Sequence, residues 1–151
     1  MSIQLDGLDA STLAVHVGNE PDAATGAVAP PLHLSTTFRH GPAGERVAGY
    51  EYQREGNPTN DRLRAALVAL EGGEDALTFA SGMAAMTTLL ESLPGGARVL
   101  FPDDCYSGLR MLFGEFLPER GLVVETIDMA DLDAVRAACA SPLAMLWIET
   151  P

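Results

Sequence analysis

The sequence contains no lysine, because all nine of its basic residues are arginines, and 21 Asp and Glu give it a formal net charge of −12. A chain this acidic repels polyanions, which argues against nucleic acid or an anionic membrane surface as a partner. No apolar run approaches the ~20 residues that a membrane span needs. The N-terminus also lacks the basic and then apolar pattern of a secretion signal. We therefore expect a cytoplasmic protein.

Cysteine is scarce as well. Cys105 and Cys139 have no second Cys or His at ligand spacing, so the sequence predicts neither a zinc site nor a disulfide framework. We expect both to be buried or half-buried free thiols in a reducing compartment. The three histidines, His16, His33 and His40, are equally isolated, and we expect them to be structural.

What the chain does contain is enough for one ordinary domain with a core: 151 residues, 47% of them apolar. Residues 1–55 differ from the rest in sequence pattern: Gly and Pro interrupt them every few positions, and only 11–17 can make a short helix. We predict that residues 1–55 form an extended arm lying across another subunit or over a site. Val28, Leu32 and Leu34 argue against full disorder of this arm.

From residue 57 onward, apolar strands alternate with helices across short loops. The sequence predicts helices over 60–70, 82–93, 107–117 and 131–140, and strands over 76–80, 98–101, 122–127 and 143–148. Thr59 is the predicted N-cap of the first of these helices, and Gly72 its stop. This alternation is typical of an α/β fold with a parallel sheet covered by helices on both faces.

The turn Ser81-Gly82-Met83 leads from a predicted strand directly into a helix. Such a junction combines unpaired backbone N–H groups with the positive end of a helix dipole, which makes it a candidate anion site. In an open α/β sheet, ligands gather at the carboxyl ends of the strands. We therefore also consider the Asp103–Gly108 loop and Glu149, which follow later predicted strands.

Together these segments resemble a known family. Its motifs are a Tyr-x-Arg-x-x-Asn-Pro-Thr run at 52–59, a Ser-Gly-Met-Ala-Ala run at 81–85, the Tyr106 loop and a Glu-Thr-Pro ending at 149–151. The chain is similar, from Thr12 to Pro151, to the pyridoxal-phosphate-dependent enzymes of cysteine and methionine metabolism, the trans-sulfuration enzymes. The resemblance implies a fold-type I, aminotransferase-like large domain, of which residues 56–151 are the first part. Residues 1–55 would precede it as an arm that contacts a neighbouring subunit.

The resemblance also implies roles for single residues. Ser81, Gly82 and Met83 would bind the phosphate of pyridoxal 5'-phosphate through backbone N–H groups. Tyr52 and Arg54 would reach the phosphate held by a neighbouring subunit, which suits a phenol O–H and a planar guanidinium. A complete site would then require a dimer at least, and a homotetramer is expected.

Tyr106 corresponds to the family's tyrosine that stacks on the cofactor ring and exchanges protons with the substrate. Glu149 either lines the site or only orders local backbone, and both readings stay open. Ser107-Gly108-Leu109-Arg110 departs from the family's Gly-Gly-Thr followed by an arginine, so no role is assigned to Arg110.

The family's lysine, which holds the cofactor as a Schiff base, its ring-nitrogen acid and its carboxylate-binding arginine have no counterpart in this sequence. Two hypotheses follow: the chain is the amino-terminal piece of an active lyase or synthase, or it is an inert partner that completes a neighbour's site. The arm favours a cystathionine γ-lyase-like elimination or replacement at the γ-carbon of an amino acid. Cystathionine γ-synthase, homoserine-ester sulfhydrylase and methionine γ-lyase remain alternatives.

Overall fold

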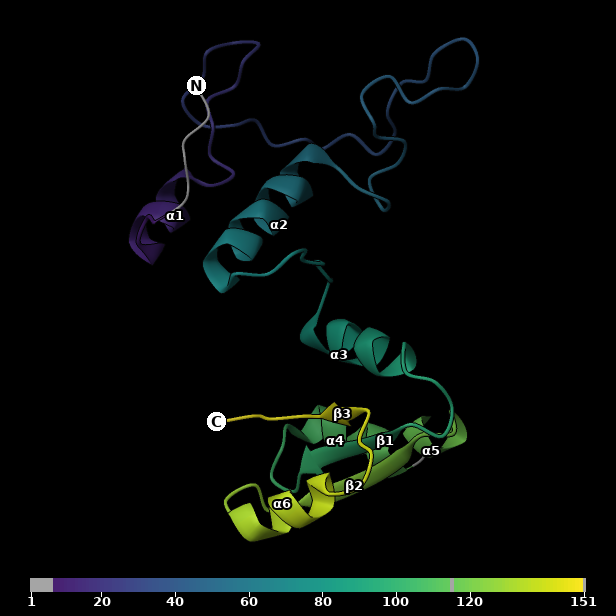
Figure 1. The fold of residues 1–151 in the computed structure, drawn as a ribbon. Helices are drawn as coiled ribbons and strands as arrows, with labels where there is room; N and C mark the ends of the chain where they lie inside the picture. Colours follow the sequence, from purple (N-terminus) through teal and green to yellow (C-terminus); the bar gives the residue numbers. More distant parts are fainter. Residues whose placement is uncertain (1–6, 115, 151) are drawn as a thin grey trace. The chain divides into compact units, whose positions relative to one another are not determined.

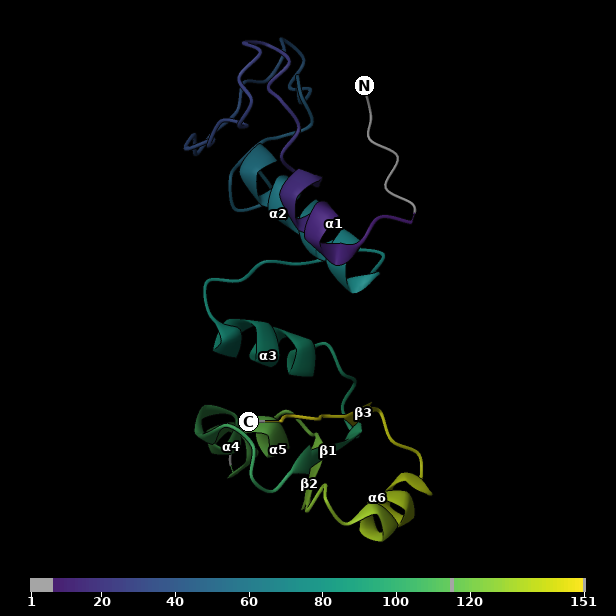
Figure 2. The ribbon, with the colours of Figure 1, turned by 90° about the vertical axis from the view of Figure 1, so that its left-hand side faces the viewer.

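The computed structural model describes residues 7–114 and 116–150. The chain divides into two compact units, Met1–Thr78 and Phe79–Pro151, and each is described by itself. In the first unit the helix α1, Ala10–His16, packs alongside the helix α2, Pro58–Glu71, as both views show (Figures 1 and 2). The division after Thr78 is a feature of the structure; that residues 1–55 contact a neighbouring subunit stays a prediction.

The helix α2 begins earlier than expected. Its N-cap is Asn57, whose side-chain oxygen accepts a hydrogen bond from the Asn60 N–H at 3.0 Å, and Pro58 takes the first helical position. Proline favours that position because its φ is already helical and its missing N–H is not needed there, so the predicted cap at Thr59 is wrong by two residues. Gly72 ends the helix in the left-handed conformation, φ 66°, as predicted.

Polar contacts attach the arm to α2. The Thr59 hydroxyl accepts a hydrogen bond from the His33 N–H at 2.9 Å, and the Arg62 guanidinium donates to the Gly18 carbonyl at 3.2 Å. Gly18 has a φ of +75°, and a Cβ there would lie 2.5 Å from the Arg62 carbonyl oxygen. Only glycine fits this approach without moving the backbone.

The predicted strand over 76–80 is not present. In the described residues this segment has no regular secondary structure and pairs with no other strand, and its Leu77 is mostly exposed. A segment becomes a strand only through a hydrogen-bonded neighbour, which apolar composition alone does not specify.

The second unit is built on a parallel sheet, as predicted. Its strands are β1, Arg98–Pro102, β2, Val123–Ile127, and β3, Met145–Leu146, in the order β2-β1-β3 (Figure 1). β1 pairs with β2 over five residues and with β3 over two, so the predicted strand at 143–148 forms only at its centre.

Helices α3, Gly82–Glu91, α4, Ser107–Gly114, and α5, Phe116–Glu119, pack on β1, and α6, Leu132–Cys139, follows β2. The core of this unit centres on Phe101, whose ring lies 4.3 Å from that of Phe113 and 6.0 Å from that of Trp147. Cys105 is buried in this core as expected, whereas Cys139 is exposed, so the prediction of two buried or half-buried thiols is wrong for Cys139. Cys139 ends the short helix α6, none of whose residues is buried.

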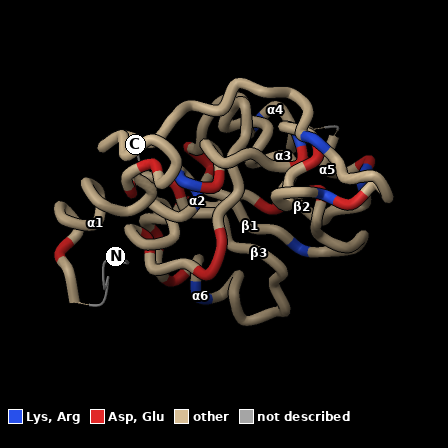
Figure 3. Tube along the Cα trace, turned by 90° about the horizontal axis from the view of Figure 1, so that it is seen from above, with Lys and Arg blue, Asp and Glu red and all other residues tan. Residues whose placement is uncertain are grey.

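Acidic residues (red in Figure 3) outnumber basic ones along the traced chain. Among the described residues, no helix has both the length and the apolar composition needed to cross a membrane.

Candidate cofactor-binding site

The start of α3 presents free backbone donors. Ser81 is the N-cap, and its hydroxyl oxygen accepts a hydrogen bond from the Ala84 N–H at 3.1 Å. Among the described residues nothing accepts the N–H groups of Gly82 and Met83. A Cβ on Gly82 would meet its nearest atom, Cε of Met86, at an ordinary van der Waals distance of 3.9 Å. Two directed N–H groups at the positive end of a ten-residue helix can therefore receive an anion.

Tyr106 lies in the loop after β1, and its carbonyl oxygen accepts hydrogen bonds from Leu109 and Arg110 where α4 begins. Its ring lies over Gly108: a Cβ there would be 2.5 Å from Tyr106 Cε1 and 3.1 Å from Met83 Sδ. The side chains of Tyr106 and Met83 thus meet at Gly108, which places the tyrosine ring near the start of α3. The sequence alone assigned Gly108 no function. The one indication was that Gly108 keeps a glycine of the family's Gly-Gly-Thr motif, whereas its neighbours differ from that motif.

Glu149 follows β3, and its carboxylate accepts a hydrogen bond from the Tyr106 N–H at 3.0 Å. With Asp104 and Thr150, these two residues line a cavity of about 270 Å³. The two strand ends meet because β1 and β3 are parallel neighbours. Glu149 therefore contacts the backbone of the Tyr106 loop and also borders the cavity, and its lining of a cofactor site stays a prediction.

The buried thiol next to Tyr106 is poorly suited to nucleophilic chemistry. Burial raises the pKa of Cys105, and the nearby Glu149 carboxylate raises it further, while Arg110 opposes these effects. A thiol held in its neutral form is a weak nucleophile and a weak metal ligand. The described residues also contain no cluster of His, Cys, Asp and Glu that could hold a metal ion.

Tyr52 and Arg54 belong to the first unit, where they form a pair. The Arg54 guanidinium carbon lies 4.3 Å from the centre of the Tyr52 ring, and its Nη1 donates a hydrogen bond to the Tyr52 hydroxyl at 3.3 Å. No carboxylate of the described residues lies within ion-pair distance of Arg54. The pair therefore combines an unneutralised cation with a hydroxyl.

The structure thus gathers the predicted residues into two sets. Ser81, Gly82, Met83, Tyr106 and Glu149 belong to Phe79–Pro151, and Tyr52 and Arg54 to Met1–Thr78. The first set fits the phosphate and ring of pyridoxal phosphate, because it offers free N–H donors beside an exposed aromatic face.

Solved structures with the same fold place the chain among the fold-type I enzymes that depend on pyridoxal phosphate. It matches a crystal structure of MetB from Corynebacterium glutamicum with a TM-score of 0.90 and 33% identity, over 99% of this chain and 39% of that one. A cystathionine γ-lyase, CalE6, from Micromonospora echinospora matches with a TM-score of 0.85 and 40% identity, over 96% of this chain and 38% of that one.

The chain belongs to the family of Cys/Met metabolism PLP-dependent enzymes, whose profile matches residues 11–151. It is 43% identical to a probable cystathionine γ-synthase from Herpetosiphon aurantiacus, over 93% of this chain and 44% of that protein. It is 40% identical to human cystathionine γ-lyase, over 93% of this chain and 35% of that protein. The chain therefore spans about two-fifths of the length of these relatives. Membership confirms the resemblance seen in the sequence, and pyridoxal phosphate as the cofactor of the family.

Proposed function

We propose that this chain contributes the phosphate-binding and ring-stacking part of a pyridoxal-phosphate-dependent enzyme of sulfur amino acid metabolism. The reaction is an elimination or replacement at the γ-carbon of an amino acid, as in cystathionine γ-lyase. The observation that carries the proposal is the pair of free N–H groups at Gly82 and Met83, with the Tyr106 ring close by. Cystathionine γ-synthase, homoserine-ester sulfhydrylase and methionine γ-lyase activities remain alternatives, because similar relatives carry both lyase and synthase names.

Each residue of the second unit has a defined task in this proposal. The Gly82 and Met83 N–H groups bind the phosphate, and the exposed Tyr106 ring holds the plane of the pyridine ring. Glu149 fixes the backbone of Tyr106 and thereby the position of the Tyr106 ring. The Tyr106 hydroxyl holds or moves a proton at the substrate. Bound pyridoxal phosphate supplies the electron sink that stabilises negative charge on the substrate carbons.

In the same proposal, Tyr52 and Arg54 serve a neighbouring subunit, and the arm, residues 1–55, makes that contact. Their pairing supports this role, because a charged guanidinium and a phenol O–H both donate to a phosphate. The protein then functions as a homodimer at least, with a tetramer as the expected assembly, in the cytoplasm. Its substrate is a small amino acid such as cystathionine or an acylated homoserine.

A second candidate is an inert partner that completes a neighbour's site. The observation in its favour is that the sequence has no lysine to hold the cofactor covalently. The two candidates differ in turnover, measured on the polypeptide as isolated from its source. An active enzyme converts cystathionine or an acylated homoserine when supplied with cofactor, and an inert partner converts neither.

Two substitutions at one position test the phosphate site. Gly82→Pro removes one N–H donor and keeps the helix, because proline is favoured at the first helical position and Ser81 already has the extended backbone that precedes proline. Gly82→Ala is the matched control, since it keeps the N–H and its Cβ would lie at an ordinary contact distance, 3.9 Å, from Cε of Met86. A hydrogen bond to a charged group contributes about 1.5–3 kcal/mol, so Gly82→Pro should weaken binding of pyridoxal phosphate about tenfold or more.

The measurement is the dissociation constant for pyridoxal phosphate, by its absorbance, with helix content checked by circular dichroism. Gly82→Ala should bind as the unsubstituted chain does. Equal dissociation constants for the two variants would remove the support for the phosphate site.

A further inference from the structure

Two carboxylates flank the proposed phosphate-binding arginine of the arm. Glu51 lies three residues before Arg54 and Glu55 immediately after it, and Arg54 and Glu55 line the same cavity of about 140 Å³. Carboxylates so placed act against anion binding in two ways: they can pair with the guanidinium, and they repel a phosphate. The structure nevertheless pairs neither of them with Arg54.

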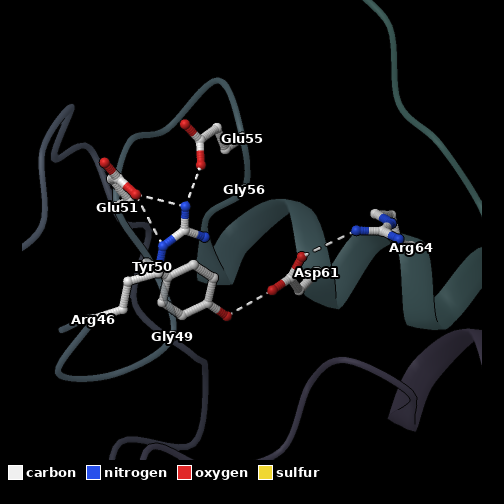
Figure 4. A pocket seen from close by; sticks show the side chains of 8 residues that line it. All are labelled: Arg46, Gly49, Tyr50, Glu51, Glu55, Gly56, Asp61 and Arg64. Atoms are coloured by element: carbon white, nitrogen blue, oxygen red, sulfur yellow. Dashed lines mark hydrogen bonds and ion pairs between the residues drawn. The ribbon is translucent and has the colours of Figure 1, made fainter.

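A second arginine takes both carboxylates. Arg46 donates to the Glu51 carboxylate through Nε at 2.9 Å and Nη2 at 2.5 Å, and Nη2 also reaches the Glu55 carboxylate at 2.8 Å. Figure 4 shows the Arg46 guanidinium between the two acids. The pairing with Glu51 and Glu55 raises the pKa of Arg46, so this guanidinium stays charged.

The backbone of the arm places Arg46 for this contact. An antiparallel bridge joins Arg46 to His40, and the Gly41 N–H donates to the Glu45 carbonyl at 2.9 Å, which closes the intervening turn. Another bridge joins Tyr52 to Thr37 and holds the segment that carries both acids. Arg46 therefore meets Glu51 and Glu55 as part of an ordered arm.

We propose that Arg46 is a positioning residue that binds Glu51 and Glu55 and so leaves the Arg54 guanidinium available to a phosphate group. The inference rests on the proposed function, because it assigns Arg54 a phosphate ligand. Among the residues that the structure describes, Arg54 contacts only the Tyr52 ring and hydroxyl in this way, and neither neutralises its charge. The four charged side chains of the segment 46–55 sum to zero, and without Arg46 they would sum to −1.

Removing Arg46 frees two acids beside Arg54. An exposed ion pair between Arg54 and either acid is worth up to about 1 kcal/mol, and a phosphate must then displace it. We therefore expect Arg46→Gln to weaken phosphate binding at Arg54 about fivefold.

The experiment follows the Arg54 Nε–H signal by NMR while inorganic phosphate, and separately pyridoxal phosphate, is added to the 151-residue chain. It compares the unsubstituted chain, Arg46→Gln, and the triple variant Arg46→Gln, Glu51→Gln, Glu55→Gln. Arg136→Gln is the matched control, because it removes one exposed arginine paired with a carboxylate in the other compact unit. Thermal unfolding of each variant checks that it is folded.

The expected result has two parts. Without ligand, Arg46→Gln moves the Arg54 signal toward that of an ion-paired guanidinium, and with phosphate it binds about fivefold more weakly. The triple variant restores the affinity, which a merely structural role of Arg46 would not allow, and Arg136→Gln changes nothing.

An Arg54 signal and affinity unaffected by Arg46→Gln would overturn the inference, as would a loss that the triple variant fails to restore. If the unliganded signal shifts as expected but phosphate and pyridoxal phosphate leave Arg54 unaffected in every chain, Arg46 does hold the two acids. The assigned role of Arg54 in the proposed function is then wrong.

Discussion

Different forces stabilise the interior of each of the two compact units. In Met1–Thr78 the only buried apolar side chain among the described residues is Val17, whereas five of the eight described arginine–carboxylate ion pairs lie there. In Phe79–Pro151 a cluster of buried apolar residues packs around Phe101. The first unit depends on directed polar contacts at exposed positions, and the second on apolar burial.

This difference indicates where each unit is sensitive. Exposed ion pairs are weak and screened by salt, so the arm's conformation should respond to ionic strength and to single charge changes. Apolar burial is nearly independent of salt and loses most when a large side chain is removed. The arm also exposes Val28, Leu32 and Leu34, which fits the proposed contact with a neighbouring subunit.

The largest effect should come from the core of the second unit. Phe101 is fully buried, and Phe101→Ala should lower the free energy of unfolding by about 3–5 kcal/mol, because it leaves a cavity that the sheet cannot close. Val17→Ala, in the first unit, should lower it by about 1.5 kcal/mol at most, for the two methyl groups removed. Urea unfolding followed by circular dichroism measures both, and equal losses would contradict the contrast between the units.

A smaller effect is expected at Tyr50, in the polar unit. Its hydroxyl donates to the Asp61 carboxylate at 2.6 Å (Figure 4), and this hydrogen bond raises the pKa of Tyr50. Its ring packs 5.2 Å from that of Phe38. Tyr50→Phe keeps the ring contact and removes the hydrogen bond, so it should destabilise the first unit by about 1 kcal/mol. Hydrogen exchange of the arm amides measures the loss. Asp61→Asn keeps an acceptor and should lose less; if it loses more, charge rather than the hydrogen bond decides.

The smallest effect concerns pH in the second unit. The bidentate hydrogen bonds from Arg98 hold the pKa of Glu125 below its ordinary value of 4.5. A carboxyl with a lowered folded-state pKa binds protons more readily when unfolded, so its stabilisation is present above pH 4.5 and is lost as the pH falls through the folded-state pKa. In Glu125→Gln the free energy of unfolding should therefore fall less steeply as the pH is lowered than in the unsubstituted chain. Urea unfolding at a series of pH values measures this, and a loss of stability in acid as steep as in the unsubstituted chain would contradict it.

Much of the second unit could be predicted from the sequence because its signals are local. Ser81 and Asp131, which the structure shows as the N-caps of α3 and α6, and the apolar residues 99–101 are local signals of where helices and strands begin. The parallel sheet follows from the alternation of these elements. The free N–H groups of the proposed phosphate-binding turn could be predicted for the same reason, since free N–H groups at a helix start depend on neighbouring residues only.

What the sequence could not reveal depends on contacts between distant residues. The segment 76–80 has strand composition, but nothing local shows that it lacks a pairing partner. The bond between Glu149 and Tyr106 joins residues 43 positions apart, and the contact of Arg46 with Glu51 and Glu55 requires the turn that brings the three together. No periodicity encodes such contacts, and they can be seen only in the structure.

The hydrogen bond from the Tyr106 N–H to Glu149 also bears on how faithfully the sheet assembles. Side chains alternate between the two faces of a strand, so a slip of β3 by one residue against β1 would turn Glu149 to the opposite face. Tyr106 would then lose its acceptor, and the loop that carries it would be released. Correct strand register is thus required for the hydrogen bond that holds the Tyr106 loop, and a misregistered chain would lack this contact at the cofactor's proposed position.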